Sequence, residues 1–264
     1  MERIASRHNP IVKRFRDLAR AGSSADTMLL DGEHLLEEAL GAEVPIEVAA
    51  FADRPGTESH ASLIARTAAT GARIITVPDQ VLTAISPVKN PSGVVAIARC
   101  RAASVAVLLG APSPLILLLH EVQDPGNAGA IVRVAEACGA TGIVTSDGSA
   151  DPFGWKALRG AMGSTFRLPI AVRQPLTRVV EQARTAGIRV FATVARGGVA
   201  PAATDLRGPV AVLLGGEGSG LPEGLIALAD ERLTIAMRPP VESLNVATAA
   251  ALIVYEAARQ RSNH

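Results

Sequence analysis

The run LILLLHEVQDPGNAGAIVRVAEACG, residues 115–139, decides the fold class of the chain. Five large apolar residues in succession, 115–119, are typical of a strand that is buried on both faces of a sheet. The following Asp124-Pro125-Gly126-Asn127 has turn chemistry, and residues 128–138 favour a helix after it. A buried strand that leads through a tight turn into a helix is the repeating unit of a parallel α/β sheet. Ligand sites in such sheets form where the strands end.

The sequence after this run repeats the same alternation. Apolar stretches at 142–145, 189–193, 210–214 and 232–235 predict further strands, and 176–186 predicts another helix. We therefore expect a mostly parallel sheet with helices on both faces.

The sequence before the run has a different organisation. Residues 101–114 become small and apolar and end in Ala111-Pro-Ser-Pro114, which is typical of a domain boundary. We divide the chain into domains 1–104 and 105–264. The first is a smaller α/β domain, with helices expected at 9–21, 33–40 and 62–70 and strands at 46–51 and 74–77.

Composition narrows the class of protein. The 264 residues carry 26 basic and 25 acidic side chains, so any surface for a polyanion must be local. One local excess lies at the amino terminus, in Arg3, Arg7, Lys13, Arg14, Arg16 and Arg20, although a solvated helix face would have the same pattern. Cys100 and Cys138 lack zinc-ligand or disulfide-framework spacing, so we expect no metal. No apolar run has membrane-spanning length, and we expect a cytoplasmic protein.

Two side chains of the first run are candidates for chemistry. Asn127 has an alternative explanation, because it or Asp124 could simply cap the helix. Arg133 follows six residues later on an otherwise small and apolar helix, where its guanidinium must reach solvent or find partners.

A second segment, VLLGGEGSGLPE at 212–223, is a buried strand that breaks into a glycine-rich loop. Such a loop lets a ligand approach the backbone closely. A Walker A loop would need Lys and Ser or Thr where Leu221-Pro222 stands, and GxGxxG fails because Leu221 replaces its last glycine. An NTPase and a dehydrogenase are therefore not supported.

A third segment, IAMRPPVESLNVATAAALIVYEAARQ at 235–260, is predicted as a strand, a proline-stiffened loop and an alanine-rich helix. Ser243 and Asn245 lie at the helix entrance, where capping explains one polar residue but not both. The small-residue face of the helix suits close packing within the domain or between subunits.

Together, and in this order, the three segments resemble the signature motifs of the SpoU/TrmH RNA 2′-O-methyltransferases. Residues 127–133 match N-x-G-[AS]-I-x-R, residues 214–221 match L-G-x-E-G-x-G-L, and residues 243–246 match S-L-N-V. Residues 156–163 resemble the intervening K-x-x-R-x-x-x-G stretch, and the amino-terminal part resembles the family's smaller substrate-binding domain on weaker cues. The chain departs from the family at Gly216, where Asn or Ala is more usual, and at Arg238-Pro239-Pro240.

The resemblance implies a fold and partners that the residues alone do not. The fold is α/β, a parallel sheet with a carboxy-terminal trefoil knot, plus the smaller amino-terminal α/β domain. The knotted domain forms a homodimer, and the substrate is RNA, docked in part by Arg7, Asn9, Lys13 and Arg14. The resemblance also implies S-adenosylmethionine as cofactor, bound by Thr193, Leu214, Gly215, Gly218, Ile235, Met237 and Leu244.

The resemblance further implies the catalytic residues. Arg133 is placed next to the reacting ribose, where it is regarded as the base, while Asn127, Glu217, Ser243 and Asn245 position it and the RNA. A guanidinium rarely gives up its proton, so an alternative is that Arg133 anchors phosphate and stabilises the forming alkoxide. Its loss should abolish catalysis in both cases. Methyl transfer from a sulfonium needs alignment and desolvation but no metal.

The RNA is the least defined part of the prediction. The added amino-terminal domain favours ribosomal RNA over transfer RNA, and both a housekeeping and an antibiotic-resistance role stay open. The remaining alternatives are a knotted enzyme that methylates a base nitrogen and a non-catalytic RNA-binding ribosome factor. The set of Asn127, Arg133, Ser243 and Asn245 favours the ribose.

Overall fold

The computed structural model of the chain describes residues 1–24, 26–53 and 60–262. The chain divides into two compact units, each with its own sheet. The first unit contains Met1–Arg101 together with Phe153–Phe166, and the second contains Ala102–Pro152 and the chain from Arg167 onward.

The second unit is built on a six-stranded sheet with strand order β11-β9-β10-β6-β7-β8, in which all neighbours are parallel. Its strands are β6 (Leu115–His120), β7 (Gly142–Thr145), β8 (Ile170–Ala171), β9 (Arg189–Thr193), β10 (Val210–Gly215) and β11 (Glu231–Leu233). β10 pairs with β6 along its whole length, from Val210 opposite Leu115 to Gly215 opposite His120. The loops after these two strands therefore leave the sheet at the same edge.

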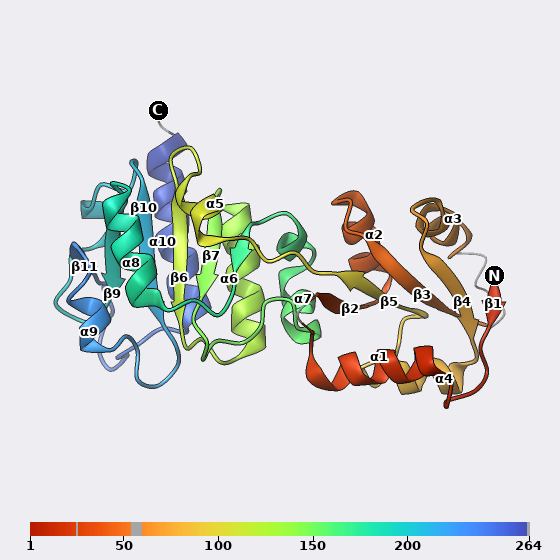
Figure 1. The fold of residues 1–264 in the computed structure, drawn as a ribbon. Helices are drawn as coiled ribbons and strands as arrows, with labels where there is room; N and C mark the ends of the chain where they lie inside the picture. The colour runs from red at the N-terminus through yellow and green to blue at the C-terminus, as the bar shows by residue number, and fades with distance from the viewer. Residues whose placement is uncertain (25, 54–59, 263–264) are drawn as a thin grey trace. The chain divides into compact units, whose positions relative to one another are not determined.

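Helices cover both faces of this sheet, as expected (Figure 1). One face packs against α5 (Val105–Leu109), α8 (Leu176–Thr185) and α9 (Glu223–Ile226). The longest helix, α10 (Val246–Ser262), packs against α6 (Pro125–Ala137) and β10. With helices on both sides, residues 115–119 of β6 are at most 1% exposed, which explains their unbroken apolar run.

The first unit has a five-stranded mixed sheet with strand order β1-β4-β3-β5-β2. Its strands are β1 (Glu2–Arg3), β2 (Thr27–Asp31), β3 (Ile46–Ala52), β4 (Arg73–Val77) and β5 (Val94–Arg99), and only β5 runs antiparallel to its neighbours. α1 (Pro10–Ala21) and α4 (Asp79–Ile85) lie on one face, and α2 (Glu33–Gly41) and α3 (Ala61–Ala69) on the other (Figure 1). α7 (Trp155–Ala161) packs on β2 and is followed by a 3₁₀ turn, Ser164–Phe166.

Most predicted elements are confirmed, and the differences have physical reasons. The helix expected at 128–138 begins at Pro125, because Asp124 caps it and proline fits the first helical position. The strand β2, which the sequence did not predict, ends at Asp31, where Gly32 turns the chain with a φ of 107°. The apolar run 105–109 is the short helix α5.

The α/β class and the parallel sheet are confirmed, whereas the knot stays a prediction. In residues 1–24, 26–53 and 60–262, no helix has both the length and the apolar character needed to cross a membrane.

Candidate functional site

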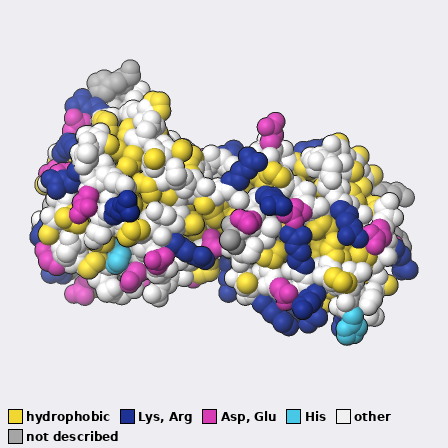
Figure 2. All heavy atoms as spheres, viewed as in Figure 1, with side chains coloured by type: hydrophobic (Ala, Val, Ile, Leu, Met, Phe, Trp, Pro, Cys, Tyr) yellow, Lys and Arg dark blue, Asp and Glu magenta, His cyan; other side chains and the backbone are white. Residues whose placement is uncertain are grey.

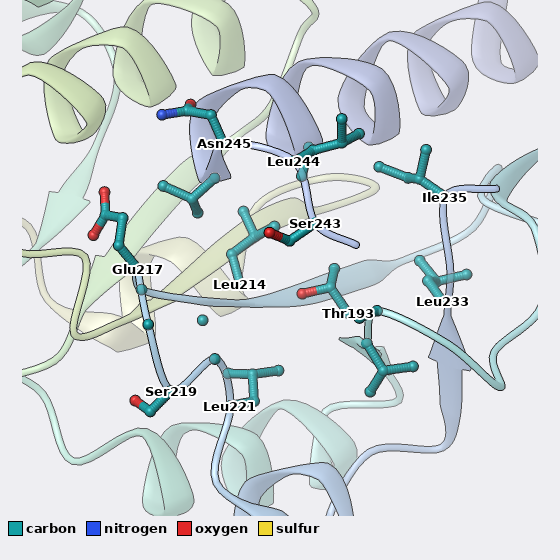
Figure 3. A pocket seen from close by; sticks show the side chains of 18 of the residues that line it. Thr193, Leu214, Glu217, Ser219, Leu221, Leu233, Ile235, Ser243, Leu244 and Asn245 are labelled. Carbon is teal, nitrogen blue, oxygen red and sulfur yellow. The ribbon is translucent and has the colours of Figure 1, made fainter. Parts of the chain in front are cut away.

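A cavity of about 580 Å³ lies in the second unit, where β9 and β10 end. Three stretches of chain surround it: the residues after β9, the glycine-rich loop after β10, and the segment that runs from β11 into α10 (Figure 3). The cavity therefore joins the second and third segments of the sequence analysis around one space.

All seven residues expected to hold the cofactor line this cavity. They are Thr193, Leu214, Gly215, Gly218, Ile235, Met237 and Leu244. Glu217, Ser243 and Asn245 line it as well. Sequence reasoning missed the apolar wall from α10, namely Val246, Ala249 and Ile253. Their spacing of three and four residues is the helical period that could have revealed it.

The cavity has a polar and an apolar end. Figure 3 shows Glu217 and Asn245 at one end, with Leu233 and Ile235 at the other. Thr193 and Ser243 bring hydroxyl groups between these ends, and the Thr193 hydroxyl donates to the Leu213 carbonyl oxygen at 2.9 Å. An elongated ligand with one polar and one apolar part fits such a cavity.

The glycine-rich loop folds back on itself at the cavity wall. Gly216 and Gly220 form an isolated antiparallel bridge, and Gly218 and Gly220 have φ angles of 103° and 67°. A Cβ on Gly215 would overlap the backbone of Gly220 and Leu221. The loop can make this fold only because Gly215, Gly218 and Gly220 lack side chains, which leaves the backbone there open to a ligand.

Gly216, where the chain departs from the usual family pattern, packs against the loop after β6. Its N–H donates to the His120 carbonyl oxygen at 2.7 Å. A Cβ at Gly216 would overlap the carbonyl oxygen of Glu121, which has a left-handed φ of 51°. Glycine is therefore required at Gly216 by the backbone path of the neighbouring loop.

Three polar side chains from the three segments form one hydrogen-bonded chain. The Asn127 amide donates to the Glu217 carboxylate, and the Asn245 amide donates to the Asn127 carbonyl oxygen at 3.0 Å. Asn245 Oδ1 also accepts from the backbone N–H groups of Ala247 and Thr248, so Asn245 is the N-cap of α10. The backbone of Asn127 is fixed as well, because its N–H donates to Asp124 Oδ1 at 2.8 Å.

Arg133 lies apart from this chain of hydrogen bonds. It is exposed on α6, about 9 Å further along the helix axis than Asn127. Within the described residues it forms no hydrogen bond or ion pair. Its guanidinium is therefore available to an anionic ligand.

The four residues expected to contact RNA in the first unit have different surroundings. Asn9 caps α1, because its side chain accepts from the Ile11 N–H at 2.9 Å. Arg14 pairs with Glu47, Arg7 donates to the Gln80 carbonyl oxygen at 3.1 Å, and Lys13 is exposed. The roles of Asn9 and Arg14 in the fold thus compete with a role in binding.

Comparisons with known proteins match both units. The model of the SpoU rRNA Methylase family matches residues 114–255, and that of the MRM3-like substrate binding domain matches residues 9–96. The 23S rRNA (guanosine(2553)-2′-O)-methyltransferase RlmP of Bacillus subtilis is 31% identical over 97% of this chain and 98% of its own.

Solved structures of similar proteins cover the same length. A crystal structure of an AdoMet-bound rRNA methyltransferase from Sinorhizobium meliloti has a TM-score of 0.84 and 31% identity, over 98% of this chain and 97% of that chain. The SpoU methyltransferase AviRb from Streptomyces viridochromogenes, in complex with AdoMet, has a TM-score of 0.81 and 28% identity, over 97% and 100%. The likeness therefore extends over both units.

Proposed function

The chain belongs to the SpoU rRNA methylase family, and from this premise we propose that it transfers the methyl group of S-adenosylmethionine to a ribose 2′-hydroxyl of ribosomal RNA. One observation carries the proposal. A cavity suited to a small organic ligand ends at a hydrogen-bonded set of polar side chains drawn from all three signature segments.

S-adenosylmethionine fits the cavity in size and character. The cavity volume of about 580 Å³ lies within the range of roughly 300–1,000 Å³ typical of small-molecule sites. The apolar side chains of Leu233, Ile235 and Leu244 would hold the adenine part, while the glycine-rich loop 215–220 offers backbone groups to the polar parts. The AdoMet-bound relatives support this assignment. The cofactor supplies a methyl group on a cationic sulfur.

The polar chain then positions the ribose beside that methyl group. Asn127 is hydrogen-bonded on both sides, to Glu217 and Asn245, so its orientation is specified. Because the three side chains come from separate segments, a small displacement of one loop would misalign the hydroxyl.

Arg133 provides positive charge. Its guanidinium has no partner within the described residues, and it would bind a phosphate next to the reacting ribose and stabilise the alkoxide as the proton leaves. We assign it this electrostatic role because a guanidinium rarely gives up its proton.

Two features support ribosomal RNA over transfer RNA. The similar full-length enzymes from Bacillus subtilis and Sinorhizobium meliloti are described as rRNA methyltransferases. The chain also carries a substrate-binding domain in addition to the methylase domain. A ribosomal RNA substrate in turn supports a cytoplasmic location.

We further propose that the methylase unit forms a homodimer through α10. Leu252 and Tyr255 lie on this helix and are 46% and 65% exposed. The two residues are about one helical turn apart, and the other side of α10 packs against α6. A second copy of the chain could therefore cover Leu252 and Tyr255.

The proposal is tested by transfer of radiolabelled methyl from S-adenosylmethionine to undermodified total RNA, with wild type compared to Arg133→Ala. We expect label in ribosomal RNA, within a dinucleotide that resists alkali, and a loss of about 100-fold or more in the variant. Binding of the cofactor, measured by calorimetry, should be unchanged, because Arg133 does not line the cavity.

Other outcomes identify the alternatives. Label in a base would indicate the nitrogen-methylating enzyme, and label in transfer RNA alone would overturn the choice of ribosomal RNA. Cofactor binding without transfer to any RNA would indicate a non-catalytic RNA-binding factor.

A further inference from the structure

A shallow groove of about 470 Å³ lies on the first unit, between α1 and the chain that follows α4. Arg7, His8, Arg16 and Arg20 line it, over a floor that includes Ala19 and Ala84. Among the residues that the structure describes, no carboxylate lines the groove. Figure 2 shows Lys and Arg side chains gathered over α1, at the lower edge of this unit.

The cations of this groove differ in their partners from three other arginines of the unit. Arg3, Arg73 and Arg99 form ion pairs with Asp53, Glu2 and Glu47. In contrast, Arg16 and Arg20 form no hydrogen bond or ion pair with any described residue. Arg7 donates only to a backbone carbonyl oxygen, that of Gln80. No carboxylate of the described residues therefore pairs with Arg7, Arg16 or Arg20.

Two acidic groups of the first unit, Asp17 and Asp31, lie outside the lining of the groove. Asp17 lines a separate hollow with Lys13 and Arg14. Ser86, at the groove's edge, donates its hydroxyl to the carboxylate of Asp31 at 2.6 Å, and burial raises the pKa of Asp31. Neither carboxylate lines the groove itself.

The arrangement of the guanidinium groups suits phosphate. Arg16 and Arg20 are four residues apart on α1, so their Cβ atoms are about 6 Å apart on one helix face. Arg7 reaches the same groove from the chain before the helix. Planar guanidinium forks bind phosphate oxygens in pairs, and successive phosphates of one strand could be contacted by successive arginines.

We infer that the groove of Arg7, His8, Arg16 and Arg20 binds the phosphate backbone of the RNA substrate, outside the nucleotide that is methylated. This inference rests on the proposed function, because it takes RNA to be the substrate. The RNA phosphates would contact the face of α1 that carries Arg16 and Arg20, whereas Arg14 on the other face pairs with Glu47. Phosphate contacts position the substrate and carry no sequence information.

The test is the double substitution Arg16→Glu and Arg20→Glu in the full chain, with unmodified 23S rRNA transcript as the probe. We expect KM for the RNA to rise by about 10-fold or more, with kcat at saturating RNA and cofactor affinity unchanged, since uniform binding is lost. The slope of log affinity against log salt should fall in magnitude by about 2.

Two further variants make the result specific. Arg66→Glu makes the same kind of charge change on α3, at an exposed position on the opposite face of the sheet, and should leave KM unchanged. The double variant Arg16→Lys and Arg20→Lys keeps the charge and should retain most of the affinity for RNA. Urea unfolding of the glutamate variant tests for a purely structural role of α1, which would lower the unfolding midpoint.

The outcomes separate this inference from the proposed function. Normal KM and salt slope in the glutamate variant, with an active wild type, would overturn the groove while the proposed function stands. Equal weakening by Arg66→Glu would also overturn it, because the effect would then come from net charge alone. If wild type transfers no methyl group, the proposed function fails, and RNA binding by the same variants still tests the groove.

Discussion

Among single residues, Asn245 makes two sets of hydrogen bonds that a substitution can separate. Its carbonyl oxygen caps α10 through Ala247 and Thr248, and its amide donates to Asn127. Aspartate at this position keeps the cap, since a carboxylate accepts the same bonds and suits a helix N-terminus. It cannot donate to Asn127, and a flip of the Asn127 amide would break the bond to Glu217 instead.

We therefore predict that Asn245→Asp keeps the urea unfolding midpoint of the wild type but loses methyl transfer by about 10-fold or more. Asn245→Ala should lose both the transfer and about 1 kcal/mol of stability, because the cap is gone. Equal activity of Asn245→Asp and wild type would mean that the bond to Asn127 has no part in catalysis.

Gly216 is a second residue with a definite requirement. A Cβ there would overlap the Glu121 carbonyl oxygen, so Gly216→Ala must displace the loop that lines the cavity. We predict that affinity for S-adenosylmethionine, measured by calorimetry, falls by about 10-fold or more, as expected for overpacking at about 1–3 kcal/mol. The matched control is Gly224→Ala in α9, where a Cβ would have open space. Unchanged affinity in Gly216→Ala would show that the loop adapts freely.

At the scale of elements, the last turn of α10 is tied to three other segments. The Arg261 guanidinium donates to the carbonyl oxygens of Leu206, Gly208, Ser113 and Pro114. The neighbouring Gln260 side chain accepts from the Leu206 N–H and donates to the carbonyl oxygens of Pro201 and Thr204. Burial lowers the pKa of Arg261, and the carbonyl oxygens replace the water that its charged guanidinium loses on burial.

We predict that Arg261→Ala lowers the free energy of unfolding by about 2–3 kcal/mol, because carbonyl groups lose a charged donor. Arg207→Ala, which removes an ion pair between exposed side chains, should cost less than about 1 kcal/mol. Urea unfolding of both variants measures the difference. Equal effects would mean that the four carbonyl contacts add nothing to stability.

The elements also show what a single sequence can and cannot predict. The strands at 142–145 and 189–193 were predicted at their observed bounds, because short apolar runs between helical stretches carry their own signal. The packing of α7 on β2 could not be predicted, since it joins residues more than a hundred positions apart. The requirement at Gly216 was equally hidden, because it depends on the backbone of Glu121 in another loop.

At the scale of the whole molecule, the motifs in sequence order were enough to predict the α/β class and the parallel sheet. The residues that line the cavity were implied by the resemblance to the SpoU/TrmH family, and the parallel strands bring them together because their carboxyl ends meet at one edge. The hydrogen-bond partners of Asn127 were not predictable, since they depend on where the loops after β6 and β10 and the start of α10 meet.

The proposed homodimer gives a prediction at this scale. Tyr255→Arg should convert the dimer into a monomer in light scattering, because a charge would be buried in an apolar contact between copies. Val107→Arg on α5, which is 60% exposed on the helix layer of the opposite sheet face, should leave the dimer intact. A monomeric wild type, or a dimeric Tyr255→Arg, would contradict an interface on α10.

Methylation of the ribose can be observed directly by incubating the full chain with unmodified ribosomal RNA and S-adenosylmethionine that carries a deuterated methyl group. The RNA is then digested to nucleosides for mass spectrometry. We predict a deuterium-labelled 2′-O-methyl nucleoside, in which the label stays with the ribose on fragmentation and which is absent with Arg133→Ala. A label that stays with the base, or no labelled nucleoside despite cofactor binding, would contradict methyl transfer to the ribose.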